Sequence, residues 1–253
     1  MLRSHPSGKN LPGPGDTKRR LLEATAVLFI EHGYEALLLR QITERAEANL
    51  AAVNYHFGGK EGLMRALLAQ QLEPLNERRL RLLAACQQSG AAPLCCEAVL
   101  GVLFAPTLAL EQSSGPGPER FSFVRFLARV YSDASPFVQA YLQEHYRPVF
   151  DRFFEAFAAA LPDLPRSELG LRLRLALRAI SGMMAGIELD QLKATASLGR
   201  PSSDTELMAR LISLVAAAIK APPDHAHSLE ALRHVLQVQQ SVAAPAKLAE
   251  ALG

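Results

Sequence analysis

The segment at 40–61, RQITERAEANLAAVNYHFGGKE, constrains the possible fold more than any other part of the chain. Its apolar residues Ile42 and Ala46 lie four positions apart, as they would on one face of a short helix. Asn49 then stands where its side-chain oxygen can cap a second helix, which runs to about His56. The sequence therefore predicts two short helices joined by a tight turn, a layout that places a small helix in the major groove of DNA.

The side chains of the second helix divide into one that packs and several that face outward. Val53 falls where a short helix packs back on its predecessor. On the other side, Asn54 can bond bidentately to an adenine edge, and Ala51 or Ala52 can touch a thymine methyl. The residues predicted to contact DNA are Arg40, Asn49, Leu50, Ala51, Asn54, Tyr55, His56 and Lys60.

Two glycines, Gly58 and Gly59, end this segment, and a further helix begins at about Lys60. The free N–H groups of a helix N-terminus attract anions, and the lysine ammonium adds a full positive charge. We therefore expect this point to bind a backbone phosphate. We also expect Tyr55 or His56 to donate a hydrogen bond to a phosphate.

Three motifs, AVLFIEHGYEA, RQITERA and AAVNYHFGGKEGL, follow one another between Thr17 and about Ala69. Over this region the sequence resembles the N-terminal DNA-binding domain of TetR-type transcriptional regulators. The resemblance implies a three-helix domain, with a first helix at about 17–32, a scaffold helix at about 40–47 and a recognition helix at about 49–56.

The resemblance also carries residue roles. It places the phosphate-contacting lysine of the family on Lys60, and its aromatic-His-aromatic signature on Tyr55, His56 and Phe57. The phrase NLAAVNYHF is similar to that of a subset of the family that includes fatty-acid-responsive regulators. Because the phrase lies in the DNA-binding region, it says little about the ligand.

A few positions depart from the family pattern. Glu47 stands where the family usually has glycine in the turn, which costs free energy if the position needs a positive φ. Leu37 and Leu38 stand near the Thr or Ser that usually caps the scaffold helix, so a cap and a phosphate contact are lost. Asn54 replaces the first aromatic of the usual pair and becomes a candidate for base specificity.

The excess positive charge of the chain is N-terminal but small. The formal net charge is +2, and residues 1–65 hold nine Lys or Arg against seven Asp or Glu, which leaves eighteen of each in the remainder. A single domain would bind DNA weakly, so we expect a homodimer that uses two. The basic cluster of Lys18, Arg19 and Arg20 fits either a solvated helix face or a DNA-facing one.

The chain is long enough to bury a substantial core, since roughly half of its residues are hydrophobic. We expect a flexible arm at 1–15, a helix-turn-helix domain at 16–65, a helical regulatory and dimerisation domain at 66–222, and a C-terminal extension with a short helix at 223–253. The Pro- and Gly-rich start lacks the apolar core of a secretory signal, and no apolar run is long enough to cross a membrane. These features predict a cytoplasmic location without membrane contact.

Apolar residues recur with the helical period, and no region alternates convincingly with period two, so we predict an all-α fold. A helix at 60–89, interrupted near Pro74, would connect the DNA-binding domain to the rest of the chain. The other expected helices lie at about 92–110, 120–134, 136–160, 167–197, 203–220 and 228–240. The expected loops lie at 111–119, 161–166 and 198–203.

The helices expected at 167–197 and 203–220 have broad apolar faces. These faces include Leu175, Ile180, Met183, Met184, Ile187, Leu207, Leu211, Leu214 and Val215. Helices that are apolar on more than one side must bury against more than one neighbour. The resemblance implies that these two helices pair with their twins in a four-helix dimer interface, whereas the residues alone favour a monomer core.

Aromatic residues gather in the other helices, where most of them are expected to form core. Met183 lies near two glycines, and its adaptable side chain can line a pocket for an apolar ligand. An acyl-type acid or thioester would need a cation at the mouth of such a pocket, although a solvated ion pair is the simpler role for each arginine. The residues predicted to bind a ligand are Phe104, Phe126, Arg129, Phe153, Arg178 and Met183.

No cofactor or metal site is expected. Cys86, Cys95 and Cys96 have no His or Cys partner at metal spacing, so buried thiols are the simpler interpretation, with a redox sensor as the alternative. An enzyme is disfavoured because the His residues are scattered and no Ser-His-Asp arrangement is found.

The sequence therefore favours a ligand-responsive DNA-binding transcriptional regulator with a helix-turn-helix domain and a larger helical domain. We expect a repressor that a small apolar effector releases from a palindromic, double-stranded DNA operator, with repression inferred from the resemblance. The alternative is a helical interaction module that has lost specific DNA binding, because Glu47 and the leucines at 37–39 depart from the usual pattern.

Overall fold

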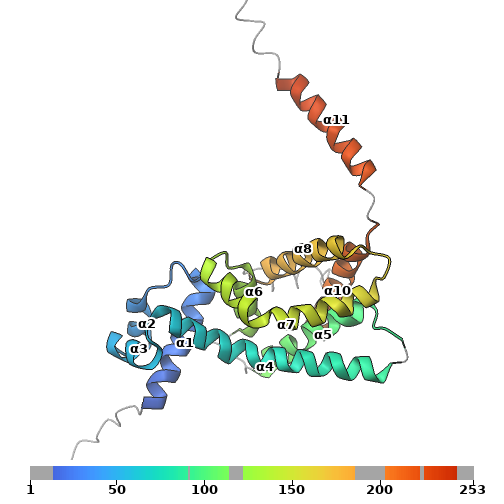
Figure 1. The fold of residues 1–253 in the computed structure, drawn as a ribbon. Coiled ribbons are helices and arrows are strands. Elements are labelled where there is room, and N and C mark those ends of the chain that lie inside the picture. The colour runs from blue at the N-terminus through green and yellow to red at the C-terminus, as the bar shows by residue number, and fades with distance from the viewer. Residues whose placement is uncertain (1–13, 91, 114–121, 186–202, 223–224, 244–253) are drawn as a thin grey trace, which may run out of the picture. The chain divides into compact units, whose positions relative to one another are not determined.

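The computed structural model describes residues 14–90, 92–113, 122–185, 203–222 and 225–243 of the chain (Figure 1). Every regular element in these ranges is an α-helix, which confirms the predicted all-α fold. The chain divides into two compact units, Met1–Ile219 and Lys220–Gly253. None of the helices in the described ranges combines the length and the apolar character needed to span a membrane.

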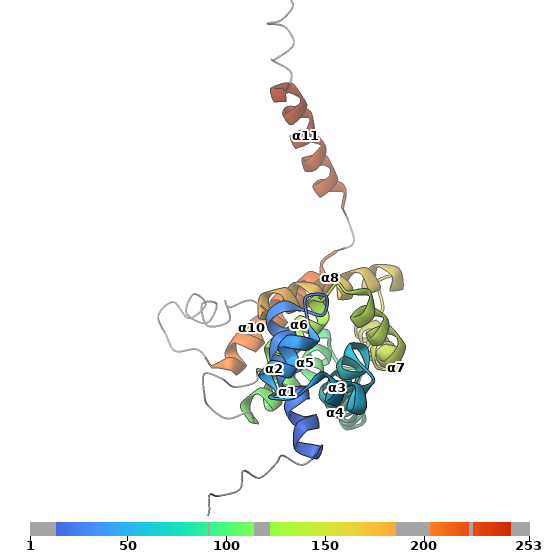
Figure 2. The same cartoon turned by 90° about the vertical axis from the view of Figure 1, so that its left-hand side faces the viewer.

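Three helices at the start of the first unit form what we call the head. They are α1 (Pro14–His32), α2 (Leu39–Arg45) and α3 (Leu50–Phe57). Each helix contributes at least one fully buried apolar residue to a shared core, such as Phe29, Ile42 and Val53. The three helices expected from the sequence are therefore present, with ends that differ by a few residues. In Figure 2, which views the chain from the head end, they stand in front of the other helices.

The following helices, up to Lys220, form what we call the body. They are α4 (Lys60–Ser89), α5 (Cys96–Ser113), α6 (Phe123–Ser132), α7 (Pro136–Ala160), α8 (Arg166–Ala185) and α10 (Asp204–Lys220). Helix α4 packs against α1 and α3 and also against α5 and α7, so it joins the head to the body (Figure 1). Helix α6 packs between α1 and α8 and forms a second connection.

Local sequence signals set several helix ends. Ser122 caps α6 by accepting a hydrogen bond from the Arg125 N–H, and Ser135 caps α7, whose first residue is Pro136. The interruption expected near Pro74 is wrong, because α4 continues through it. A proline removes one helical hydrogen bond. The flanking residues Leu72 and Leu75 are buried in the core and hold both halves of the helix in line.

Other boundaries differ from the sequence prediction. Helix α5 begins at Cys96, a few residues after Pro93, and it continues to Ser113, so the first three residues of the loop expected at 111–119 are helical and the rest lie outside the described residues. Helix α8 begins at Arg166. The second half of the helix expected at 167–197, most of the loop at 198–203 and nearly all of the arm at 1–15 lie outside the described residues.

The buried residues of the first unit form two clusters. One joins the head to α4, α6 and α7, and in it Phe29 of α1 meets Phe126 of α6 edge-on, with ring centroids 5.8 Å apart. The other lies within the body and takes side chains from α4 to α8 and α10. The head is thus fixed to the body through apolar packing on α6 as well as through α4.

The second unit contains α11 (Ala226–Ala243), close to the short helix expected at 228–240. Its residues from Ala226 to Gln240 are exposed, including Leu232 and Leu236.

Candidate DNA-binding surface and ligand cavity

Helix α3 is short, and a capping residue sets each of its ends. The Asn49 side-chain oxygen accepts a hydrogen bond from the Ala52 N–H at 2.9 Å, which confirms the expected cap. Gly58 adopts the left-handed conformation with a φ of 72° and donates its N–H to the Asn54 carbonyl. Glycine suits this position because it has no Cβ. The result is a helix of eight residues with defined ends.

The faces of α3 divide as the sequence predicts. Val53 is completely buried and anchors the helix in the head. Tyr55 is 84% exposed, and Ala51 and Asn54 are also exposed. Leu50 is likewise exposed, whereas His56 is only partly so. The predicted base-contacting side chains therefore lie on one solvent-facing surface, beside the partly exposed His56.

The turn before α3 adopts the backbone conformation that glycine favours. Glu47 has a φ of 46°, the left-handed region in which a side chain with a Cβ is strained. Its carboxylate is exposed, and it lies 3.6 Å from the Arg20 guanidinium. The departure at Glu47 thus stores strain in the turn and places a negative charge near the surface of α3.

The leucines before α2 have different roles. Leu38 is the N-cap residue and makes no side-chain capping hydrogen bond, as expected for an apolar residue there. Leu37 is 1% exposed and belongs to the head core. Burial of Leu37 offsets part of the loss of the cap by removing apolar surface from water. Arg40, in the first turn of α2, is exposed.

Lys60 is the first residue of α4 and is held against the head. Its ammonium lies 4.5 Å from the Tyr34 ring centroid and 3.4 Å from the Glu35 carbonyl oxygen. Burial raises the pKa of the Tyr34 phenol, so the ring under Lys60 stays neutral and presents its π face to the cation. These contacts hold the Lys60 side chain against the segment between α1 and α2.

Gly62 is a residue whose role the sequence analysis did not identify. A Cβ built on it would lie 1.8 Å from the Phe57 carbonyl oxygen, so only glycine permits the end of α3 to approach the first turn of α4 this closely. The signal was available in the sequence, since a glycine inside the first turn of a helix is unfavourable unless close packing requires it.

The arginines of the basic cluster of α1 form ion pairs with nearby carboxylates. Arg19 bonds Asp16 at 2.6 Å and Glu23 at 2.7 Å, and the hydrogen bonds to these carboxylates raise the pKa of Arg19. Arg20 lies 3.6 Å from Asp16 as well as from Glu47. Lys18 approaches the Phe57 ring, with its ammonium 6.0 Å from the centroid. The cluster is therefore closer to a solvated helix face than to a set of unpaired cations.

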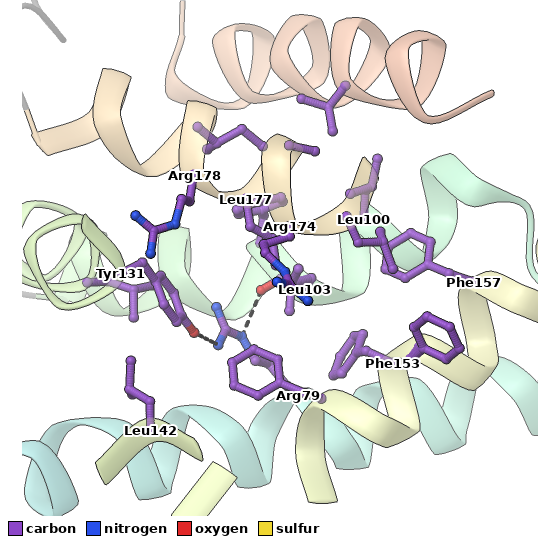
Figure 3. A pocket seen from close by; sticks show the side chains of 18 of the residues that line it. Arg79, Leu100, Leu103, Tyr131, Leu142, Phe153, Phe157, Arg174, Leu177 and Arg178 are labelled. Carbon is purple, nitrogen blue, oxygen red and sulfur yellow. Dashed lines mark hydrogen bonds between the residues drawn. The ribbon is translucent and has the colours of Figure 1, made fainter. Parts of the chain in front are cut away.

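The body encloses a cavity of about 720 Å³, lined by side chains from α4 to α8 and α10 (Figure 3). Most of the lining is aliphatic and aromatic. Its charged side chains are Arg79, Arg147, Asp151, Arg174 and Arg178. A cavity of this size and character suits a small apolar molecule.

The structure brings together only part of the predicted ligand set. Phe104, Phe153 and Arg178 line the cavity, whereas Phe126 and Arg129 do not. The side chain of Met183, near the end of α8, lies outside what the structure describes.

Phe126 and Arg129, whose predicted role in ligand binding is not supported, lie three positions apart on α6, on the face opposite the cavity. Phe126 is fully buried against Phe29 of the head. The Arg129 Nε donates to the Ile30 carbonyl at 3.0 Å. The cavity side of the same helix is formed by Val124, Leu127, Ala128 and Tyr131.

A buried carboxylate extends this connection between α6 and the head. Asp133 follows α6, and its Oδ2 accepts a hydrogen bond from the Tyr34 N–H at 3.0 Å, while its Oδ1 accepts one from the Ser135 N–H at 2.9 Å. Gly33 has a φ of 76°, and a Cβ on it would lie 2.9 Å from the Asp133 Oδ2. The close approach therefore depends on glycine at the end of α1.

The apolar residues of α8 and α10 divide between core and surface. Ile180, Leu207, Leu211 and Val215 are buried in the body. Leu171 and Leu175 on α8 and Leu214 on α10 remain exposed, the last at 68%. Ile187 lies outside the described residues, as do the side chains of Met183 and Met184.

The expectation that the three cysteines are buried thiols is wrong for two of them. Cys96 is buried, Cys86 is partly exposed and Cys95 is exposed, because Cys95 precedes the first turn of α5 whereas Cys96 packs into the body core. In the part of the chain that the structure describes, no group of His, Cys, Asp and Glu side chains could hold a metal ion.

Two protein-family models match the chain. Residues 21–67 match a model described as bacterial regulatory proteins, tetR family. Residues 102–218 match a model described as tetracyclin repressor-like, C-terminal domain. The first match covers most of the head and the start of α4, and the second covers most of the body.

Curated relatives match over a short stretch. The chain is 35% identical over 57 residues to the probable HTH-type transcriptional regulator YttP of Bacillus subtilis, a match that covers 22% of this chain and 28% of that protein. It is 33% identical over 64 residues to the HTH-type transcriptional repressor AcnR of Corynebacterium glutamicum, covering 25% and 34%. The chain thus spans about a third of the length of these relatives.

Among solved structures, the fold is similar to that of a probable transcriptional regulatory protein, RHA5900. The similarity covers 81% of this chain and 100% of that chain, with a TM-score of 0.53 and 18% sequence identity. At this identity the similarity is one of fold.

Proposed function

The chain belongs to the TetR family of transcriptional regulators, since it carries both of the matched domains, and we propose that it is a ligand-responsive, DNA-binding repressor. In this proposal a dimer inserts two copies of α3 into successive major grooves of a near-palindromic operator. The observation that carries the proposal is α3 itself, which is capped at both ends, anchored by Val53 and exposed at Asn54 and Tyr55.

The surface around α3 has separate groups for reading bases and for holding phosphates. Asn54 offers both an acceptor and a donor to an adenine edge, and Ala51 and Leu50 offer apolar contact to thymine methyls. Tyr55 and His56 can donate hydrogen bonds to DNA phosphates, and the N–H groups around Asn49 can approach the DNA backbone. Further phosphate contacts come from Arg40 and Lys60.

The effector is a small apolar molecule that enters the body cavity, and acyl-type compounds are among those that fit its apolar lining. The recognition-helix phrase NLAAVNYHF, similar to that of fatty-acid-responsive members, agrees with this class without deciding it.

Helix α6 is the element that would carry the effect of the ligand to the head. One face of α6 lines the cavity through Leu127 and Tyr131. The opposite face contacts the head through Phe126 and Arg129. A ligand that shifts α6 must therefore disturb the contacts that set the head position. A ligand lowers DNA affinity only by its preference for head positions that no longer match the two half-sites.

A homodimer would be formed through α8 and α10, where Leu175 and Leu214 expose apolar surface. Two heads are needed because one head with a small positive charge would bind DNA weakly. Operator DNA also implies that the protein acts in the cytoplasm.

Binding of the purified chain to genomic DNA fragments would test the proposal. A fragment selected by the protein and a scrambled fragment of equal length and composition should be titrated at two salt concentrations. We expect a preference of at least about 1,000-fold for the selected fragment, retained as salt rises, since specific binding exceeds nonspecific binding by at least that factor. Equal affinity for both fragments would favour the alternative of an interaction module without specific DNA binding.

A further inference from the structure

Arg79 of α4 is a buried cation beside the cavity. Its side chain is 2% exposed, and a guanidinium remains charged in proteins. Arg78 and Arg81 in the same segment, EPLNERRLRLL, are exposed, whereas Arg79 lies inside the body. In Figure 3 its guanidinium points into the cavity, next to Tyr131.

Among the described residues, the groups that bind this cation are all neutral. The Arg79 Nε donates to the Leu103 carbonyl at 2.8 Å, and Nη1 donates to the Asn76 Oδ1 at 3.2 Å and to the Tyr131 hydroxyl at 3.1 Å. Nη2 donates to the Thr107 Oγ1 at 3.4 Å. No carboxylate in the described ranges pairs with Arg79. A buried charge is normally paired, because taking an ion out of water is costly.

The hydrogen-bond geometry leaves donors for an anion. A guanidinium has five N–H groups, and these four bonds use four of them, so one on Nη2 is left. Tyr131 accepts a hydrogen bond from Arg79 and keeps its own O–H to donate. The remaining guanidinium N–H and the Tyr131 O–H are therefore two donors on hydrogen-bonded side chains, and hydrogen bonds from a guanidinium to a carboxylate are among the strong ones.

The charged side chains that line the cavity also favour an anionic ligand. The described part of its lining contains four arginines and one carboxylate, that of Asp151, and the remainder is mostly apolar. Asp151 lies 3.8 Å from Arg147 and so already has a cationic partner. Arg174 and Arg178 reach into the cavity from α8, on the other side from Arg79 (Figure 3).

We propose that the cavity binds an apolar monocarboxylate. Arg79 and Tyr131 hold its carboxylate at the inner wall, and the apolar lining surrounds its hydrocarbon part. This inference rests on the proposed function in that it names the chemical class of the effector. It differs from the sequence expectation, which offered Arg129 or Arg178 as a cation at the mouth of the pocket. The carboxylate supplies the counter-charge that no described carboxylate provides for Arg79.

Calorimetric titration of the full-length protein with decanoate and with decanol would test this proposal. The two probes have the same chain and differ in charge. We expect decanoate to bind about 10- to 100-fold more tightly, as for a buried hydrogen bond to a charged group. Equal affinities, or no binding of decanoate, would overturn the inference.

Variants test which side chains bind the carboxylate of decanoate. Arg79→Met should abolish the preference for decanoate, and Arg178→Met, which removes an exposed cation of the same cavity, should retain most of it. If Arg79→Met does not fold, Tyr131→Phe removes only the neighbouring hydroxyl and should reduce the preference several-fold. A preference that survives in both Arg79→Met and Tyr131→Phe, or that disappears in Arg178→Met, would contradict the assignment.

The same samples separate this inference from the proposed function. Operator binding is measured without any ligand, so a protein that binds its operator specifically but shows no preference for decanoate would overturn the inference alone. A protein that prefers decanoate but does not discriminate operator from scrambled DNA would overturn the proposed function alone.

Discussion

Asn54 of α3 and Lys60 at the start of α4 belong to the proposed DNA-binding surface and differ in what they can recognise. An amide offers one acceptor and two donors in a fixed geometry, whereas an ammonium is a point charge that any phosphate satisfies. Specificity and affinity should therefore be separable at these two positions.

We predict that Asn54→Ala relaxes the preference at one base pair in each half-site, with a loss of about 1–3 kcal/mol of discrimination. Lys60→Ala should weaken binding to all sequences to a similar extent and make binding less dependent on salt. Competition binding against single-base variants of the operator would measure both effects. Identical behaviour of the two variants would refute this division of roles.

Glu47 provides a test of backbone strain. With a φ of 46°, Glu47→Gly should be more stable than Glu47→Gln by about 1 kcal/mol, because both variants lose the charge but only glycine relieves the left-handed backbone. Urea unfolding measures the difference in free energy of unfolding. Both variants should bind DNA more tightly than the natural chain, since each removes a negative charge beside α3. Equal stabilities would show that the turn is not strained.

Local rules explain which residues of the site could be predicted from the sequence. Asn49, Val53 and Tyr55 occupy positions whose burial follows from the period of one short helix and its cap. Arg79 could not be found in this way, because its burial depends on the Leu103 carbonyl of another helix. Phe126 was assigned to the ligand for the same reason, since an aromatic on α6 can face either the cavity or the head.

Among the helices, α6 contacts both the cavity and the head. Its last turn leads to Asp133, whose carboxylate oxygens accept hydrogen bonds from the Tyr34 and Ser135 backbones. The carboxylate is buried, so a change in its hydrogen bonds cannot be compensated fully by water.

We predict that Asp133→Asn lowers the free energy of unfolding by about 1–3 kcal/mol, because the amide offers one acceptor where the carboxylate offers two. It should also reduce the loss of operator affinity on addition of effector, since the head is then less firmly held by α6. Asp163→Asn, at an exposed site, is the matched control and should change stability by less than about 0.5 kcal/mol. Unchanged stability in Asp133→Asn would exclude the carboxylate as a structural link.

Helix boundaries were predictable where the sequence carries a strong start or stop signal. Helix α7 matches the expected range of 136–160, because a serine and a proline begin it. Helix α4 matches the range of 60–89, yet Pro74 did not interrupt it, since burial of both flanking turns outweighs one missing hydrogen bond. Helix α5 has no such signals and began and ended later than expected.

At the scale of the whole molecule, the proposed dimer depends on side chains that have no role in the monomer core. Leu175 and Leu214 are 60% and 68% exposed, so substitution there should leave the fold of one chain intact.

We predict that the double substitution Leu175→Arg with Leu214→Arg shifts the protein to monomers, because four unpaired cations would meet at a twofold interface. Sedimentation equilibrium measures the change, and operator affinity should fall with it. Leu38→Arg introduces a cation at a similarly exposed leucine of the head and should leave the oligomeric state unchanged. A dimer that persists in the double variant would place the interface elsewhere.

The cavity is the feature least accessible to sequence analysis. It is formed where six helices meet, from α4 to α8 and α10, so its lining follows from packing between segments far apart in the chain. Phe104, Phe153 and Arg178 were predicted because they lie in apolar runs, but the same reasoning could not exclude Arg129.

Methylation protection of guanine N7 on a selected operator tests the central claim most directly, because that atom lies in the major groove. We expect protection in two symmetric half-sites whose centres are separated by a whole number of helical turns, each about 10 base pairs, in keeping with paired α3 helices. We also expect addition of decanoate to remove the protection. Specific binding without major-groove protection, or protection confined to one unrepeated site, would contradict it.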